Sequence, residues 1–321
     1  MVKLSYKFDK TTLEALYLDK LFSTKFGRGK NALTVKDKFD KLKAKYPYSV
    51  IFCDISFNDI IFVEPEKIKS LIYKIEHRIV EQSKIKYKQE REQQKFIYEA
   101  KDELKKVFKY ENKFQEVISN FFEKELKTKT CYYCNIHYVN EYKVDEEEYK
   151  NEFTLDHYYD KGSYPYLALS LYNLIPSCYV CNSKLKKTIE LDALPPNSND
   201  FDFDKRVKFK LFLSSSCKNL NIKSKDDIEI PLKEKYSDKY NKYIKLFKLN
   251  ERYSAHKDIV YEMMKNAELY PESRLKELQE LTGIPYQQIK KDIFKLIDEE
   301  ADLSKEPFSK LIKDISQELG L

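Results

Sequence analysis

Two Cys-x-x-Cys pairs constrain this chain more than any other feature of its sequence. The first pair is Cys131-Tyr-Tyr-Cys134 and the second is Cys178-Tyr-Val-Cys181. Pairs with this spacing hold zinc through four thiolates in a closed tetrahedral site, and such a site joins segments that are far apart in the sequence. We therefore predict a structural zinc ion bound by Cys131, Cys134, Cys178 and Cys181. On spacing alone, a zinc ribbon without further chemistry is an equally good explanation.

The composition is that of a charged, water-soluble protein. Of the 321 residues, 42% are hydrophobic and 35% are charged, and no apolar run approaches the roughly 18–20 residues that a membrane span needs. The first residues contain no apolar run long enough for a signal peptide, so we expect a cytoplasmic protein without a membrane contact. In that compartment, paired cysteines favour metal binding over disulfides.

The distribution of residue types predicts a mostly helical α+β fold in three parts. Only 5 glycines and 10 prolines are present, which favours long helices and few turns. We expect an N-terminal helical region over residues 1–125, a metal-containing core over 126–195, and a short β element followed by a C-terminal helical region over 196–321.

Local patterns refine this division. Glu64-Pro65-Glu66 is typical of a helix start, and the charged stretch 83–107 predicts one long exposed helix. The alternation from Val207 to Leu213 predicts a strand, with residues 228–230 as its candidate partner. The run 49–53 fits either a strand or a buried helical turn.

An acid–histidine pair lies between the two cysteine pairs. Asp156 directly precedes His157, and Asn182 directly follows the last cysteine. A carboxylate beside an imidazole offers a metal ligand next to a general base, which is a catalytic arrangement. Adjacent residues of a strand point to opposite faces, so both can serve one ion only where the strand ends or twists.

Residues 131–186 resemble the HNH endonuclease family in its zinc-stabilised form. The resemblance rests on Cys-Tyr-Tyr-Cys, on Thr-Leu-Asp-His, and on the segment Tyr-Pro-Tyr-Leu-Ala-Leu-Ser-Leu-Tyr-Asn-Leu-Ile-Pro-Ser-Cys-Tyr-Val-Cys-Asn. The letters of the family name correspond to His157, Asn173 and Asn182. Asn182 is a departure, because many members have histidine there. The resemblance implies a ββα-metal core, in which two strands and a helix hold one divalent ion.

The resemblance also implies a role for each polar residue of the motif. Asp156 coordinates the catalytic ion, and Asn182 contributes its amide oxygen or holds a bound water. His157 accepts a proton from the attacking water, while Asn173 braces the loop and orients His157. These oxygen ligands suit Mg²⁺ or Mn²⁺ better than a second zinc.

Further charged residues of the motif are candidates for contacts with substrate. Lys161 and Lys186 are the candidate phosphate contacts, and Asp160 is either neutral in function or an additional ligand. The net charge of +6 permits binding to nucleic-acid phosphates without requiring it.

The expected function is that of a metal-dependent endonuclease, with DNA as the expected substrate. The segment is most similar to stand-alone bacterial HNH proteins that accompany ATPases in anti-phage defence, so an ATPase is the expected partner protein. The alternative is a zinc-containing subunit without catalysis, which binds nucleic acid or acts as a scaffold.

Overall fold

Helices dominate the first 126 residues, as the scarcity of glycine and proline predicts. The structure is a computed structural model, and it describes every residue except 7, 28, 112, 127–128, 140, 144–148, 152, 216, 218–221 and 299. The helices of this part are α1 (Lys10–Ser23), α2 (Val35–Lys43), α3 (Tyr48–Ile51), α4 (Phe57–Ile61), α5 (Ile68–Lys86), α6 (Glu90–Val107) and α7 (Lys113–Leu126).

Short polar motifs start several of these helices. Thr34 before α2 and Ser56 before α4 each form a capping box with an aspartate three residues on, which satisfies backbone N–H groups at the helix start. A short 3₁₀ turn, η2 (Pro65–Lys67), precedes α5, and its proline stands at the first position as expected. Residues 49–51 of the ambiguous run belong to α3, so the helical alternative is correct for them.

The prediction of one helix from 83 to 107 is wrong. The helix α5 ends at Lys86, Tyr87 is extended, and α6 begins at Glu90. The two helices form a hairpin in which the buried Ile79 and Ser83 belong to α5 and the buried Phe96 and Ala100 to α6. Burial of these side chains outweighs the helix propensity of the charged residues at the break.

Short antiparallel strands and helical turns fill the middle of the chain. The structure has β1 (Glu141–Lys143) paired with β2 (Tyr149–Asn151), and β3 (Thr154–His157) paired with β4 (Leu174–Ser177). The connection from β3 to β4 contains the 3₁₀ turns η3 (Pro165–Leu167) and η4 (Leu171–Asn173), and β4 is followed by the π-helical segment η5 (Val180–Lys186).

The last part of the chain mixes two small sheets with helices. Its strands are β5 (Val207–Phe209), β6 (Phe212–Leu213), β7 (Ile228–Glu229) and β8 (Leu232–Glu234). Its helices are α8 (Phe203–Arg206), α9 (Asn241–Leu246), α10 (Leu249–Ser254), α11 (Lys257–Leu269), α12 (Glu272–Thr282), α13 (Tyr286–Phe294) and α14 (Ser309–Leu319); a 3₁₀ turn, η6 (Lys225–Asp227), precedes β7.

The single strand predicted from Val207 to Leu213 is divided into β5 and β6. The strand β5 pairs with β8, and β6 pairs with β7, so the expected partner at 228–230 pairs with the second half alone. Between the two ladders the N–H of Lys210 donates to the carbonyl of Pro231, 3.0 Å away. Pro231 has no N–H to return, which interrupts the ladder at this point.

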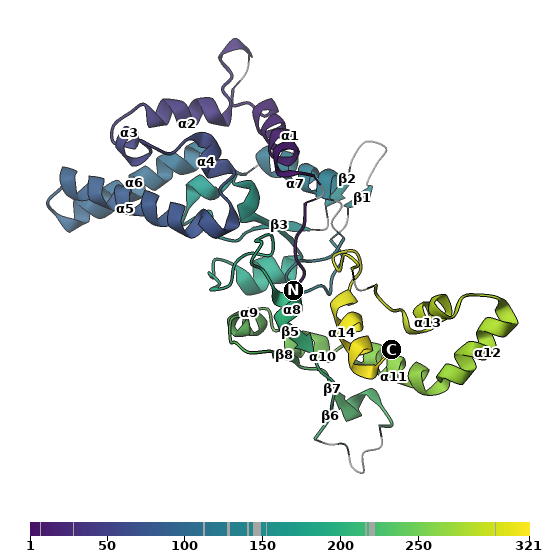
Figure 1. Ribbon diagram of the computed structural model, residues 1–321. Coiled ribbons are helices and arrows are strands. Elements are labelled where there is room, and N and C mark those ends of the chain that lie inside the picture. The colour runs from purple at the N-terminus through teal and green to yellow at the C-terminus, as the bar shows by residue number, and fades with distance from the viewer. Residues whose placement is uncertain are drawn as a thin grey trace.

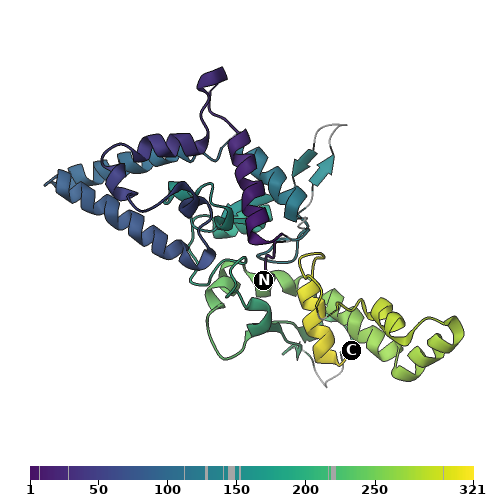
Figure 2. The same cartoon turned by 45° about the horizontal axis from the view of Figure 1, so that its top comes forward.

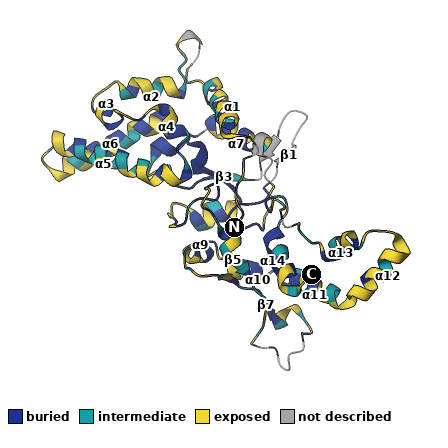
Figure 3. Ribbon diagram, viewed as in Figure 1, coloured by how far each residue is buried: buried dark blue, intermediate teal, exposed yellow. Residues whose placement is uncertain are grey.

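The elements form two lobes joined through the β3–β4 region. The N-terminal helices make up one lobe and the elements from α8 to α14 the other, and both views keep the lobes apart (Figures 1 and 2). Buried residues concentrate at β3 and on the inner faces of the helices (Figure 3). One core cluster runs through both lobes, whereas α12 and α13 project from the body around a small cluster of their own, made of Leu275, Ile289 and Phe294.

The architecture is therefore α+β and mostly helical, with small antiparallel sheets. Within the described residues, no helix combines the length and the apolar character needed to cross a membrane. The division at residues 125 and 195 stays a prediction, because the common core includes residues from all three parts.

Candidate metal centre and adjoining pocket

The first cysteine pair lies on a tight knuckle between two bridged segments. An isolated bridge joins Thr130 to Tyr138, and the N–H of Cys131 donates to the carbonyl of His137, 3.0 Å away. Asn135 has a φ of 53°, a left-handed conformation that asparagine tolerates better than most residues. The second pair begins directly after β4 and continues into η5, so β4 holds Cys178 close to the first knuckle.

The four predicted ligands come together in the interior. Cys131, Cys134, Cys178 and Cys181 are all buried, and their ligand atoms lie within 4.8 Å of one another. The sulfurs of Cys134 and Cys178 are 4.0 Å apart. Four sulfurs at the usual Zn–S distance on a tetrahedron are about 3.8 Å apart, so the group fits a metal ion such as zinc.

Electrostatics also favour a cation at this place. Burial raises the pKa of the Cys131 and Cys181 thiols, whereas hydrogen bonds with the neighbouring thiols lower the pKa of Cys178 and, against its burial, that of Cys134. Four thiolates are therefore unstable together unless a metal ion compensates their charge.

The short helix α10 supports the cluster from the C-terminal lobe. The guanidinium Nη1 of Arg252 lies 3.2 Å from the sulfur of Cys181, and the hydroxyl of Tyr253 donates to the carbonyl of Cys134 over 2.7 Å. A positive charge beside the thiolates offsets part of their negative charge and orients the ligands. Neither residue was singled out from the sequence, because they lie more than 70 positions from Cys181 with no local signal.

Asn135 is a second support that sequence reasoning missed. Its side chain is fully buried, and its Nδ2 donates to Thr130 Oγ1, the Leu303 carbonyl and the Glu306 carbonyl at 3.0–3.2 Å. Its Oδ1 accepts from the Ser309 hydroxyl and from the N–H of Lys310, each at 3.1 Å. One residue thus ties the first knuckle to the start of α14.

The hairpin of β3 and β4 delivers the acid–histidine pair beside the cluster. Asp156 lies opposite Ile175, and His157, the last residue of β3, lies opposite Leu174. The two side chains make separate sets of contacts, as the alternation of a strand requires. Both residues can serve one ion only where the strand ends or twists, and β3 does end at His157.

Asp156 is engaged on both oxygens. Its side chain is only 2% exposed. Oδ2 accepts a hydrogen bond from the hydroxyl of Tyr133 at 2.5 Å. The ammonium of Lys186 lies 3.1 Å from Oδ2 and 3.4 Å from Oδ1. Burial raises the pKa of Asp156, and the attraction of Lys186 opposes this effect. Lys186 is itself completely buried, so its ammonium does not reach the surface as a phosphate contact in this conformation.

His157 is held in one tautomer by its surroundings. Its Nε2 is 2.9 Å from the carbonyl oxygen of Ala168, which only accepts, so Nε2 carries the proton and Nδ1 has the free lone pair. The ring packs edge-on against Tyr110 at 4.6 Å, and the ammonium of Lys161 lies 4.5 Å from the Tyr110 ring centre. Burial, together with the positive charge of Lys161, lowers the pKa of His157 to about 3.

Asn173 supports the loop that follows His157. It is fully buried; its Nδ2 donates to the carbonyls of Tyr159 and Leu167, and its Oδ1 accepts from the N–H of Tyr159 at 2.8 Å. Within the described residues, no hydrogen bond joins the side chains of Asn173 and His157. Asn173 thus braces the loop, and it can orient His157 only indirectly, through the backbone that joins them.

The remaining candidates line one pocket with the acid–histidine pair. This pocket has a volume of about 290 Å³, and Asp156, His157, Lys161 and Asn182 are among its lining residues. The Nδ2 of Asn182 donates to Thr154 Oγ1 over 2.9 Å. Because the amide nitrogen is occupied in this way, the amide oxygen is the group left to act as a ligand.

Asp160 also lines this pocket, but its carboxylate is already used. Its Oδ2 accepts from the N–H of Ser163 at 2.8 Å and from the hydroxyl of the same residue at 3.0 Å. These bonds close the turn after β3, and the neutral alternative for Asp160 agrees with them.

The donor set suits a divalent ion in chemistry, although one donor is occupied. One carboxylate and one amide oxygen, completed by water and phosphate, are ligands that Mg²⁺ and Mn²⁺ accept. The carboxylate of Asp156 already has a cation beside it, the ammonium of Lys186. Tyr110, Tyr133 and Lys186 therefore define this site as much as Asp156, His157 and Asn182 do.

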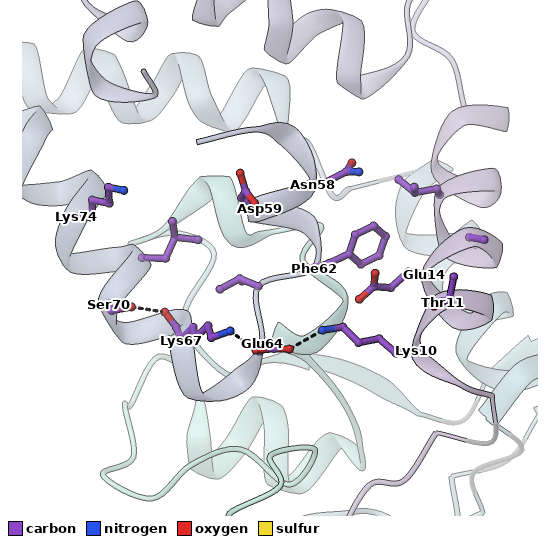
Figure 4. A pocket seen from close by; sticks show the side chains of 14 residues that line it. Lys10, Thr11, Glu14, Asn58, Asp59, Phe62, Glu64, Lys67, Ser70 and Lys74 are labelled. Carbon is purple, nitrogen blue, oxygen red and sulfur yellow. Dashed lines mark hydrogen bonds and ion pairs between the residues drawn. The ribbon is translucent and has the colours of Figure 1, made fainter. Parts of the chain in front are cut away.

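A larger pocket, of about 700 Å³, lies elsewhere, between α1 and the segment from α4 to α5 (Figure 4). Two of its lysines pair with one of its glutamates: Glu64 lies 2.5 Å from the ammonium of Lys10 and 2.6 Å from that of Lys67. No residue predicted for chemistry lines it, so its size alone does not indicate a site.

Comparisons with protein-family models, with curated proteins and with solved structures found no match to this chain.

Proposed function

We propose that the protein is a metal-dependent endonuclease of the HNH type that hydrolyses nucleic-acid phosphodiester bonds, with DNA as its substrate. The observation that carries this proposal is the convergence of Asp156, His157 and Asn182 on one pocket. The buried four-cysteine group adjoins them, because β3 pairs with β4, and Cys178 directly follows β4. In this proposal the group holds zinc and fixes the two segments that carry the catalytic residues.

In this proposal each residue of the site has the role that its contacts suggest. Asp156 and Asn182 would hold Mg²⁺ or Mn²⁺, which supplies a positive charge for the phosphate and for the leaving 3′ oxygen. The Nδ1 of His157 accepts the proton of the attacking water, because Nε2 is committed to Ala168. Lys161, half-buried beside the same pocket, offers its ammonium to a phosphate oxygen.

A pKa near 3 makes His157 a weak base in the conformation described here. The negative charge of a bound phosphate favours the imidazolium and raises this pKa toward the working pH. Substrate binding and activation of the base are thus coupled in this proposal.

The cellular context belongs to the same proposal. The helical lobes are too extensive to serve only as a cover for the β3–β4 region, and we propose that they bind a partner. By analogy with the HNH proteins that the motif resembles, the partner is an ATPase of an anti-phage defence system, and it activates or targets the nuclease. Co-purification of an ATPase from the native host with the intact protein as bait tests this part, and the absence of any ATPase would contradict it.

A plasmid-nicking assay tests the catalytic proposal. Supercoiled DNA incubated with Mg²⁺ or Mn²⁺ is expected to be nicked by the unaltered protein, and His157→Ala is expected to reduce the rate by about 10²–10⁴-fold. His137→Ala, at an exposed histidine near the first knuckle, is the matched control and should retain the activity. Equal cleavage by the His157→Ala variant would refute the assignment of the base.

One observation favours the non-catalytic alternative. Asp156 and His157 are only 2% and 8% exposed, so little of either residue is accessible to a phosphodiester in this conformation. A zinc-containing binding or scaffold subunit needs no such access. That alternative predicts salt-dependent DNA binding without cleavage in the presence of any divalent ion, also after the ATPase partner has been added.

A further inference from the structure

Lys186 occupies the position of a counter-ion inside the candidate site. Its ammonium lies 3.1 Å from Oδ2 of Asp156 and donates to the carbonyl of His157 over 3.1 Å. It also lies 5.5 Å from the ring centre of Tyr158. Lysine and aspartate are both buried, so each needs the other for its charge to be stable there.

The backbone of η5 explains why this lysine points inward. The segment is π-helical, and the N–H of Lys187 donates to the carbonyl of Asn182, five residues back. This wider turn leaves Lys186 buried, whereas Lys184 and Lys187 are exposed. π-Helical turns of this kind cost stability and are frequent at functional sites.

A divalent ion on the same carboxylate would meet this ammonium at close range. Both oxygens of Asp156 already have partners, and the Tyr133 hydroxyl is one of them. Because Asp156 and Lys186 are both buried, repulsion between two cations that share this carboxylate is only weakly screened. The carboxylate therefore accommodates one of the two cations well, but not both.

We propose that Lys186 and the catalytic divalent ion are alternative counter-ions of Asp156. The inference rests on the proposed metal-dependent function and adds a mechanism that controls it. With Lys186 on the carboxylate the site is closed to metal; metal binding requires the ammonium to leave, and Lys186 then becomes accessible. Lys186 thus sets the metal affinity of the site.

Direct measurement of Mn²⁺ binding by electron paramagnetic resonance tests the competition without reference to cleavage. The variant Lys186→Met is expected to bind Mn²⁺ at least about tenfold more tightly than the unaltered protein, because Asp156 loses its resident cation. The control Lys184→Met, at an exposed lysine of the same segment, should bind as the unaltered protein does. Asp156→Asn should abolish the site. Affinity of Lys186→Met equal to or weaker than that of the unaltered protein overturns the inference.

A second measurement needs no variant, which matters if Lys186→Met folds poorly. Reductive methylation of the unaltered protein, followed by peptide mass spectrometry, reports which lysines are accessible. Lys186 should be protected without metal and should become reactive at the Mn²⁺ concentration that fills the site, with Lys184 as the reference that reacts in both states. Equal protection of Lys186 in the two states contradicts the exchange.

These results are separable from the test of the nuclease itself. If Lys186→Met gains Mn²⁺ affinity but no DNA is ever cut, the exchange of counter-ions stands and the nuclease proposal fails. If DNA is cut and Lys186→Met gains no affinity, only the exchange is refuted.

Discussion

Acidification from pH 7 to pH 5 is expected to remove about 2 kcal/mol of folding stability through His157 alone. Burial, with the charge of Lys161, lowers the pKa of this side chain from 6.5 to about 3 in the folded protein. The unfolded chain therefore binds a proton at a higher pH than the folded one. The stability associated with the neutral ring is intact above about pH 6.5 and is lost as the pH falls toward 3.

The magnitude follows from the two pKa values. At pH 5 the unfolded imidazole is almost fully protonated and the folded one almost fully neutral, so the unfolded state gains about 1.4 kcal/mol for each pH unit below its own pKa. Between pH 6.5 and pH 5 the loss of folding stability amounts to about 2 kcal/mol, and almost none of this loss has occurred at pH 7.

Urea denaturation at pH 7 and pH 5 measures this effect in the unaltered protein and in His157→Gln. Glutamine keeps an N–H donor for the Ala168 carbonyl but does not titrate. The variant should lose about 2 kcal/mol less than the unaltered protein between the two pH values. His137→Gln, at an exposed histidine, should leave the pH dependence unchanged. Identical pH dependence of the unaltered protein and His157→Gln would refute the claim that His157 is buried as a neutral ring.

Three further predictions concern the metal centre and its supports. Asn135→Ala should lower the free energy of unfolding by about 4 kcal/mol in urea denaturation, because several buried hydrogen bonds are lost and alanine tolerates the left-handed backbone poorly. Asn135→Gly removes the same hydrogen bonds but tolerates this backbone conformation. A loss below about 1 kcal/mol in the glycine variant would therefore contradict the role of the side chain. Purified protein should contain about one zinc per chain by elemental analysis, and Cys131→Ser should lose both the zinc and most of the thermal stability; unchanged melting after complete removal of zinc would exclude a structural site. Tyr133→Phe should destabilise the fold by about 1.5–3 kcal/mol, because the carboxylate of Asp156 loses a buried donor, and a change below about 0.5 kcal/mol would show that the hydroxyl is replaced by another donor.

Local sequence patterns predicted much of the secondary structure. The proline at Glu64-Pro65-Glu66 placed a helix start correctly, because its fixed φ and missing N–H suit a first turn. Phe114, Ile118 and Phe121 recur at helical spacing in the sequence, and all three are buried on α7. Where local patterns failed, a tertiary contact outweighed them, as in the hairpin that divides residues 83–107 and the proline opposite Lys210.

The cysteine spacing determined by itself which residues form the metal-binding group, because each Cys-x-x-Cys knuckle is a local structure and two of them complete a tetrahedron. The motif likewise placed Asp156 and His157 on a strand. Only the tertiary structure decided their surroundings: Tyr110 against the imidazole, Arg252 beside the thiolates, and Lys186 on the carboxylate. These contacts join residues 30 to 71 positions apart whose spacing has no period, and burial of charge makes such partners obligatory without indicating in the sequence which residue will supply them.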